Sequence, residues 1–280
     1  MRVVVALIVV AVVVAVLGWQ SQRLPAAFKR EVRAELRASS PSAMVTDADL
    51  ATLPHAVATY LRRSGVVNHS RVKNFHAEFA AEMRGGPDEP WMQATADQYE
   101  FFNPMARLFF MRASRSGVPF KVFHRYAGDA ATMDVRVAGI VPIVSLSGTE
   151  MTKSETVTLF NDMCVLAPAT LIDAPVTWVV RDEHTVRGTF TNAGYTVRAD
   201  LIFDDDGDLA DFRSDDRSMS EGKTMRRLPW NTPLSDYRSF GDVRLAAVGE
   251  ARWTDGGRTW TYGRFVLKSI RYNVPPGAID

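Results

Sequence analysis

Residues 75–80 read FHAEFA, with the apolar residues Phe75, Ala77 and Phe79 at every second position. A period of two is typical of a β-strand that buries one face, because successive side chains of a strand point to opposite sides. The sequence GGPD at 85–88 then predicts a turn, and residues 91–102 read as the returning strand. The fold therefore begins with an antiparallel hairpin.

The same alternation continues toward both ends of the chain. Further strands are expected at 108–113, 120–127, 131–138, 176–180, 185–191, 195–203, 209–214, 250–254 and 260–272. Asp-Gly-Gly at 255–257 is a strong hairpin signal, because glycine accepts a positive φ. A sheet of roughly ten strands has to curl, because its twist accumulates. We expect an α+β, mainly β protein: a large curled antiparallel sheet, or half-barrel, with a covering central helix and an N-terminal transmembrane helix.

The covering helix is predicted over residues 152–168, TKSETVTLFNDMCVLAP. Thr152 and Glu155 have the spacing of a capping box, and Pro168 is expected to end the helix. A helix laid across the concave side of a curled sheet can leave an apolar cleft beneath it.

The carboxylates Glu155 and Asp162 lie on one side of this helix, about 10.5 Å apart at 1.5 Å per residue, together with Leu159 and Met163. One interpretation makes them an acid–base pair or polar anchors for a ligand. The other has Glu155 capping its own helix and Asp162 bonding a neighbouring loop.

The segment LPWNTPL at 228–234 reads as a loop stiffened by two prolines. Its tryptophan can wall a ligand cleft or plug the end of the sheet. The expected ligand contacts are Glu155, Leu159, Asp162, Met163, Trp178, Trp230 and Tyr262.

The N-terminus carries an uninterrupted apolar run at 3–17. It is short for a membrane span, which needs about 20 apolar residues, but it has no small-x-small cleavage site. We predict an uncleaved single-pass anchor at 1–20, an amphipathic basic helix and linker at 21–45, and one β-rich domain at 46–274, on the extracytoplasmic side of the cell membrane. The apolar stripe of the basic helix can rest on anionic lipid or pack on the domain.

Composition excludes several classes of protein. A formal net charge of +1 argues against nucleic-acid binding, which usually needs a strongly basic face. The single cysteine, Cys164, rules out an intrachain disulfide and is expected to be a buried apolar residue. The five histidines have no metal-ligand spacing, the acidic run at 204–208 fits a hairpin turn better than a calcium loop, and no cofactor motif occurs.

Three segments carry a resemblance to known proteins: LPHAVATYLRRSG at 53–65, ETVTLFNDMCVLAP at 155–168, and GEARW at 249–253 followed by YGR at 262–264. The chain resembles, over about residues 50–273, a bacterial family of membrane-anchored proteins without an assigned function. More loosely, the order of strands, helix and strands is similar to the LolA-like half-barrels of lipoprotein carriers. That likeness implies a concave cleft for acyl chains.

Three functions follow from these features. The leading hypothesis is a membrane-tethered domain that binds an apolar or lipid-like molecule, and it requires a cavity under the helix. The second is an enzyme on a small organic substrate that uses Glu155 and Asp162, which requires both carboxylates in one pocket and a perturbed pKa. The third is a structural or interaction protein with an exposed apolar patch. No catalytic residue, metal or cofactor is assigned, and the oligomeric state is left open.

Overall fold

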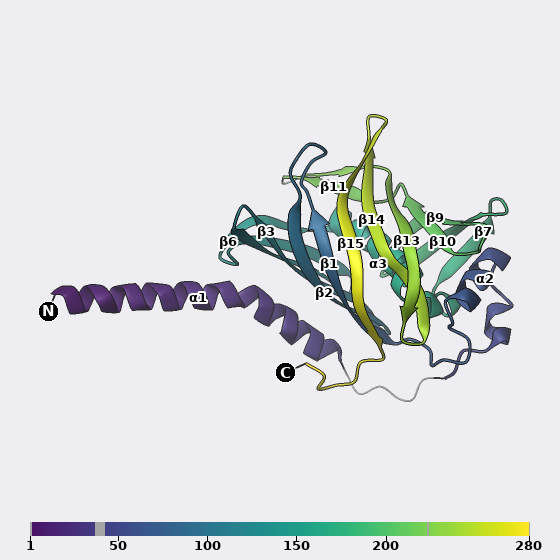
Figure 1. Cartoon of the computed structure of the whole chain (residues 1–280), viewed down its shortest axis with the longest axis horizontal. Helices are drawn as coiled ribbons and strands as arrows, with labels where there is room; N and C mark the ends of the chain where they lie inside the picture. The colour runs from purple at the N-terminus through teal and green to yellow at the C-terminus, as the bar shows by residue number, and fades with distance from the viewer. Residues whose placement is uncertain (1, 37–42, 223, 280) are drawn as a thin grey trace.

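The computed structural model describes residues 2–36, 43–222 and 224–279, and their side chains from residue 11 onward. Its helices are α1 (Arg2–Glu35), α2 (His55–Arg63) and α3 (Thr149–Leu166), with single 3₁₀ turns at Asp47–Leu50 and Pro168–Ile172. Figure 1 shows α1 projecting from a body made of strands, with α2 and α3 on the opposite side of the sheet.

Thirteen strands form one sheet, and two more form a separate hairpin. The sheet strands are β1 (Asn74–Met83), β2 (Met92–Phe102), β3 (Met105–Arg115), β4 (Val118–Ala127), β5 (Ala130–Val137), β6 (Val141–Ser147), β7 (Val176–Val180), β8 (Thr185–Asn192), β9 (Tyr195–Phe203), β10 (Leu209–Ser214), β13 (Trp230–Phe240), β14 (Val243–Asp255) and β15 (Arg258–Tyr272). The separate hairpin is β11 (Ser218–Glu221) and β12 (Thr224–Arg227). The large curled antiparallel sheet is therefore confirmed, with more strands than the alternation predicted.

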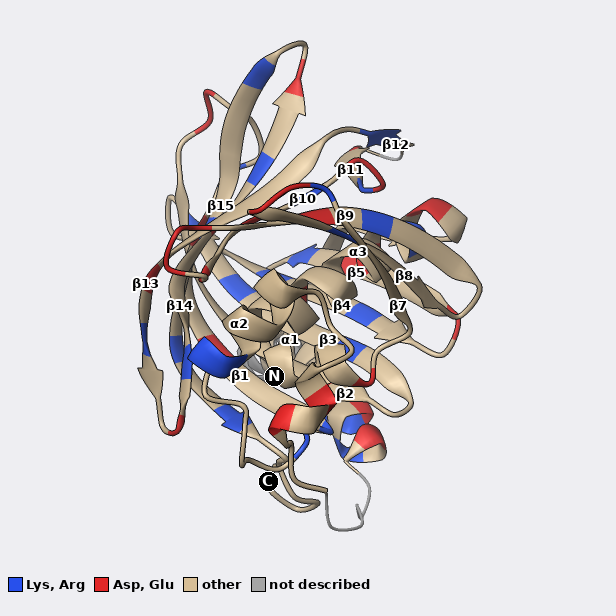
Figure 2. Cartoon of the chain, turned by 90° about the vertical axis from the view of Figure 1, so that its right-hand side faces the viewer, with Lys and Arg blue, Asp and Glu red and all other residues tan. Residues whose placement is uncertain are grey.

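The order of strands explains where α3 lies. The sheet runs β6-β5-β4-β3-β2-β1-β15-β14-β13-β10-β9-β8-β7, and α3 joins β6 to β7 at its two opposite edges. The chain therefore has to cross the whole sheet between these strands. It does so on the concave side, where Figure 2 shows the sheet curling around α3. Almost every residue of α3 is buried as a result, not only one stripe.

The start of α3 corrects the predicted capping box. The helix begins at Thr149 with Gly148 at its N-cap, where φ is 98°, so Thr152 is already inside the helix. The Thr152 hydroxyl accepts a hydrogen bond from the backbone N–H of Ala131 at 3.0 Å and donates one to Gly148 O at 3.0 Å. Glu155 therefore does not cap the helix, and its carboxylate is buried inside the protein.

The outer face of the sheet is covered by the second half of α1. Phe28 packs on Tyr99, Phe110 and Phe123, with ring centroids 6.0, 5.4 and 5.7 Å apart. Leu24, Val32 and Leu36 complete the buried stripe. The apolar face of this amphipathic helix is therefore used by the domain itself, which decides between the two alternatives that the sequence left open.

Polar contacts fix α1 along the same face. Arg125 Nε lies 3.1 Å from a carboxylate oxygen of Glu31, and Lys121 Nζ donates to Ser21 O at 2.7 Å. The helix continues without a break through residue 20, and Figure 1 shows it bent along its length, as expected for a helix that contains Pro25.

The predicted membrane anchor is tested only in part. Among the residues whose side chains are described, no helix combines the length and apolar character that a membrane crossing requires. The first half of the predicted anchor, at 1–10, lies outside those residues. In the second half, Val12, Val13, Val14, Val16, Leu17 and Trp19 are exposed.

The predicted loop at 228–234 was wrong, because its greater part belongs to strand β13. Trp230 pairs with Trp253 of β14 and with Ser214 of β10, and Pro233 lies at the end of the short β10–β13 ladder. Two prolines suggested a loop because proline cannot donate to a ladder. Other turns are as expected: Gly256 and Gly257 have φ of 55° and 82° between β14 and β15, and 204–208 forms the turn between β9 and β10.

Candidate functional site

A cavity of about 180 Å³ lies between α3 and the inner face of the sheet. Most of its wall is apolar and comes from β1, β3 and β13–β15. That wall includes Phe79, Met111, Leu234, Ala247, Phe265 and Leu267. Polar side chains meet it on the α3 side, chiefly from β2, β3 and the helix. An apolar chamber with polar groups gathered on one side is the usual form of a small-molecule site.

Arg107 of β3 is the centre of the polar side. Its Nε donates to an oxygen of Asp162 at 2.6 Å, and its Nη1 donates to an oxygen of Glu155 at 3.1 Å. The two carboxylates lie two turns apart on α3, so one guanidinium spans the helix face between them. All three side chains are buried, and each charge is compensated in place.

The pairing sets the ionisation of the cluster. Burial alone would raise the pKa of Glu155, but the contacts with His124, Arg107 and Arg217 outweigh it and lower that pKa to about 2. Burial likewise opposes the charge on Arg107, and the surrounding carboxylates more than restore it, which raises its pKa above the usual value. Glu155 and Arg107 are therefore fixed as ions near neutral pH.

Glu100 of β2 behaves in the opposite way. It is fully buried directly across the ladder from Arg107, and burial together with the negative charge of Asp162 raises its pKa well above the usual range. Gln98 Nε2 donates to Glu100 at 3.0 Å and to Asp162 at 2.8 Å. The other oxygen of Glu100 has no hydrogen-bond partner within the described part of the chain. The raised pKa makes Glu100 a neutral acid beside the ion cluster.

A second group of polar side chains surrounds Arg217, which precedes β11. Its Nε donates to Thr158 Oγ1 at 3.1 Å and its Nη1 to the Tyr262 hydroxyl at 3.0 Å. The guanidinium lies over the rings of Trp230 and Trp253, 4.5 and 5.2 Å from their centroids. This arrangement holds a cation flat beside the cavity, because aromatic faces attract guanidinium groups.

The structure brings four of the seven predicted site residues to this cavity: Glu155, Asp162, Trp230 and Tyr262. Their role in binding stays a prediction. Trp230 is buried, and its Nε1 donates to the Tyr262 hydroxyl at 3.0 Å, so it belongs to the cavity wall as well as to the strand.

Leu159, Met163 and Trp178 do not line the cavity. Successive helix residues are rotated by about 100°, and the arc of α3 that meets the cavity also carries Thr158, Asn161 and Val165, which turns Leu159 and Met163 away. Met163 instead lines a larger hollow of about 530 Å³, together with Phe102 and Met105. Trp178 packs on Phe160, with ring centroids 6.3 Å apart.

Sequence reasoning missed Arg107, His124, Arg217 and Glu100. Arg107 could have been predicted to face inward, because it lies two and four residues before Phe109 and Met111 and therefore points to the same side of the strand. The predicted strand began at Leu108, one residue too late to include it. Glu100 likewise shares its side with Gln98, and nothing local indicates that this side is buried.

The chemistry available to the carboxylates is limited. Both line one cavity and Glu155 has a perturbed pKa, as the enzyme hypothesis requires. The direction of the shift is wrong for a general acid, since a pKa of about 2 keeps Glu155 charged. Both groups are also bound to one buried arginine, which suits a fixed electrostatic support better than proton transfer.

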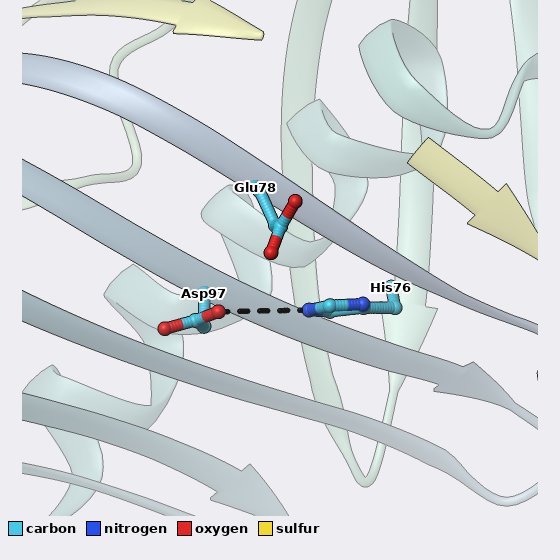
Figure 3. A group of neighbouring side chains, drawn as sticks. All are labelled: His76, Glu78 and Asp97. Atoms are coloured by element: carbon cyan, nitrogen blue, oxygen red, sulfur yellow. Dashed lines mark ion pairs between the residues drawn. The ribbon is translucent and has the colours of Figure 1, made fainter. Parts of the chain in front are cut away.

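Outside the cavity, the outer face of the sheet groups three potential metal ligands, His76, Glu78 and Asp97 (Figure 3). Glu78 and Asp97 are cross-strand partners on β1 and β2, which local spacing could not reveal. Each is already engaged: Arg271 contacts His76 Nδ1 at 3.1 Å, Ser269 donates to Glu78 at 2.6 Å, and Arg112 donates to Asp97 at 2.8 Å. Two neighbouring guanidinium groups oppose a cation here, so the group is best described as an ion-pair network.

Comparison with known proteins gives a family and distant structural neighbours. The model of a family of unknown function, DUF6544, matches residues 43–265. No curated protein matches the sequence.

The structural neighbours include LolA-like proteins. A domain described as outer membrane lipoprotein-sorting, from Vibrio parahaemolyticus, is 10% identical with a TM-score of 0.39, over 72% of this chain and 86% of that one. A LolA superfamily protein from Nitrosomonas europaea is 8% identical with a TM-score of 0.39, over 79% and 96%. The Mycobacterium tuberculosis lipoprotein LppX is 16% identical with a TM-score of 0.17, over 60% and 87%. No function is carried over from these neighbours.

Proposed function

Because this chain belongs to DUF6544, a family of unknown function, we propose its function from its own geometry: it binds an apolar or amphipathic small molecule between α3 and the curled sheet. The observation that carries the proposal is the cavity of about 180 Å³ with an apolar wall and polar groups on one side. An apolar cavity of roughly 150 Å³ is enough to hold a benzene-sized molecule. The cavity therefore suits a small ligand or one section of a longer chain.

The arrangement of the walls supports binding rather than simple packing. Aliphatic and aromatic side chains lose unfavourable contact with water when an apolar ligand covers them, by roughly 25 cal/mol per Å². The ion cluster around Arg107 gives the helix side a fixed position, so the chamber is preformed. A preformed site loses less conformational entropy on binding.

Filling the cavity tests this proposal. Ala247 of β14 lines it, so Ala247→Phe should weaken the binding of cis-parinaric acid, an acyl chain that fluoresces in apolar surroundings, by about tenfold or more. Val248→Phe is the matched control, because the next residue of a strand points to the other face. Both variants are first compared with the unmodified chain by circular dichroism. Equal binding by all three would contradict the proposal.

The proposal includes a membrane tether. The support is the exposed apolar side of α1 between Val12 and Trp19 and the apolar run that precedes it in the sequence. In this arrangement α1 is a single-pass anchor, and the domain lies on the extracytoplasmic side of the cell membrane. Because the second half of α1 packs on the sheet, the anchor would continue directly from a helix that belongs to the domain.

The tether has its own experiment. The full chain should stay in the membrane pellet after alkaline carbonate extraction, and Val13→Arg should release a large share of it, since a charge in a span costs about 2.5–3.5 kcal/mol. Trp91→Arg, on the domain, is the control for added charge. Protease added outside spheroplasts should cut the domain if the proposed orientation is right. Complete release of the unmodified chain by carbonate would rule out the tether.

A further inference from the structure

The polar side of the cavity has unused hydrogen-bond donors. The Tyr262 hydroxyl accepts from Trp230 Nε1 and from Arg217 Nη1, both at 3.0 Å. A phenol has one proton to donate, and among the described residues nothing accepts it. Because Tyr262 lines the cavity, that O–H is available to a bound molecule.

Arg217 adds a second donor to this set, and His124 lies beside it. Arg217 uses Nε and Nη1 within the protein, but its Nη2 is 3.9 Å from the nearest oxygen of Glu155, which is beyond hydrogen-bond distance. His124 meets Glu155 through Nδ1 at 3.4 Å, and its Nε2 donates or accepts according to the tautomer, so it is not counted among the donors. Both side chains line the same cavity.

The acceptors on this side are, by contrast, already occupied. Asp162 accepts from Asn161, Gln98 and Arg107, and one oxygen of Glu155 accepts from Arg107. The oxygens of Thr158 and Asn161 accept from Arg217 and Thr232. The orphan oxygen of Glu100 belongs to a residue that does not line the cavity.

The charges balance without a ligand. Arg107 and Arg217 face the carboxylates of Glu155 and Asp162, and the raised pKa of Glu100 keeps that acid neutral. The remaining carboxylate of the lining, Glu250, is paired with Arg252 and Arg264. The site therefore does not require a charged partner, whereas its unused donors do require an acceptor.

From this inventory we propose that the ligand is an acyl compound, with an apolar chain in the cavity and a carbonyl or carboxylate oxygen bound by Tyr262 and Arg217. The inference rests on the proposed binding function and narrows it to a chemical class. Trp230 and Trp253 hold the Arg217 guanidinium in the plane that presents Nη2 to such an oxygen. A molecule whose head is only a donor, such as an amine, would leave these protons unpaired and meet the guanidinium charge.

The experiment compares four ten-carbon competitors that displace cis-parinaric acid: decanoic acid, methyl decanoate, decane and decylamine. Each is tested on the unmodified chain, on Tyr262→Phe, and on Tyr195→Phe as a control outside the cavity. We expect the acid or the ester to bind about tenfold more tightly than decane, with decylamine weakest. Tyr262→Phe should remove most of that preference and leave decane unchanged, and Tyr195→Phe should alter neither.

Each outcome has a separate meaning. Preference for the acid alone makes the carboxylate the recognised head, and preference for the ester makes it the carbonyl; both support the inference. Equal affinity for all four, a preference for decylamine, or an unchanged preference in Tyr262→Phe overturns it while leaving apolar binding intact. Failure of every competitor and of the reporter to bind would instead remove the proposed function. Denaturation midpoints establish that both tyrosine variants fold.

Discussion

Strands β2 and β3 present two contrasting faces. On the inner face Glu100 stands opposite Arg107, beside Gln98, and these polar side chains are buried beneath α3. On the outer face of the same strands, Tyr99 stands opposite Leu108, and these apolar side chains are buried beneath α1. At this point of the two strands the polar pair faces the core and the apolar pair faces outward, which reverses the usual antiparallel pattern. Further along β3 the usual pattern returns, because Phe109 and Met111 are apolar on the inner face and Arg112 is exposed on the outer face.

The difference shows that coverage, and not the sheet alone, decides where polar residues can go. The outer face can be apolar because α1 removes it from water. The inner face can hold ions because α3 brings matching carboxylates to Arg107, in a place where an unpaired charge would be very costly. The two helices therefore differ in what they cover: α1 supplies apolar burial on the outer face, and α3 supplies compensated charge at Arg107 in addition to its own apolar burial.

Removing Arg107, the central cation of the inner face, should cause the largest loss of stability. Arg107→Ala leaves two buried carboxylates without their partner and should lower the free energy of unfolding by about 3–5 kcal/mol. Arg112→Ala is the matched control, since Arg112 on the same strand pairs with Asp97 in the open and its pair is worth about 0–1 kcal/mol. Urea denaturation of both variants checks this. Similar losses of stability in Arg107→Ala and Arg112→Ala would contradict the proposed difference between the inner and outer faces.

The decrease in the free energy of unfolding at acid pH should depend on Glu155. Its folded pKa of about 2 lies below the unfolded value of 4.5, so its stabilising contribution is present above pH 4.5 and is lost as the pH falls toward 2. The shift corresponds to roughly 3 kcal/mol. Glu155→Gln should remove that part of the pH dependence, measured as unfolding free energy from pH 2 to 7. If Glu155→Gln leaves the pH dependence below pH 4.5 unchanged, Glu155 is not held as an ion in the folded protein.

On the outer face, Phe28→Ala should detach α1 from the sheet. Loss of a buried phenylalanine costs about 3–5 kcal/mol in a closed core, and undocking of the helix limits the loss here to roughly 2–3 kcal/mol. Hydrogen exchange should rise in 22–35 and stay unchanged in α3. Lys29→Ala, beside it in the sequence, provides the comparison. Increased exchange in α3 would mean that the two faces are coupled.

Glu100 should give the smallest effect, with the opposite sign. Its folded pKa is raised above 4.5, so its burial costs stability increasingly as the pH rises from 4.5 toward that raised pKa. Glu100→Gln keeps the shape and the contact with Gln98 without the need for a proton. We expect a gain in the free energy of unfolding at pH 8 and none at pH 4, from denaturation at the two pH values. A loss at pH 8 would contradict the neutral assignment.

Alternation and turn chemistry predicted the sheet well, because both are local. Residues 75–80 and the glycines at 256–257 carry their own signals, and the helix around Asp162 was found from its motif. The strand β13 was missed because its two prolines argue for a loop until β10 and β14 are known to flank it.

The candidate site was predicted only on the helix side. Arg107 meets Glu155 and Asp162 across 48 and 55 residues of chain, and no local pattern encodes such a pairing. Leu159 and Met163 share a helix face with the carboxylates, but the position of the cavity, which selects among these residues, is set by packing against distant strands.

The topology also bears on how the chain reaches its native state. β1 pairs with β15, so Phe75 cannot pair until Tyr272, the last residue of the sheet, has been synthesised. A fold with such distant partners has a high contact order and is expected to form slowly. During folding, water still contacts the first hairpins, the charged residues of α3 and the apolar outer face of the early strands. Their unpaired strand edges favour aggregation. α1 is synthesised before the strands and can cover the outer face of β3 and β4 as soon as they form. It can therefore protect the first half of the sheet from aggregation until β15 is made.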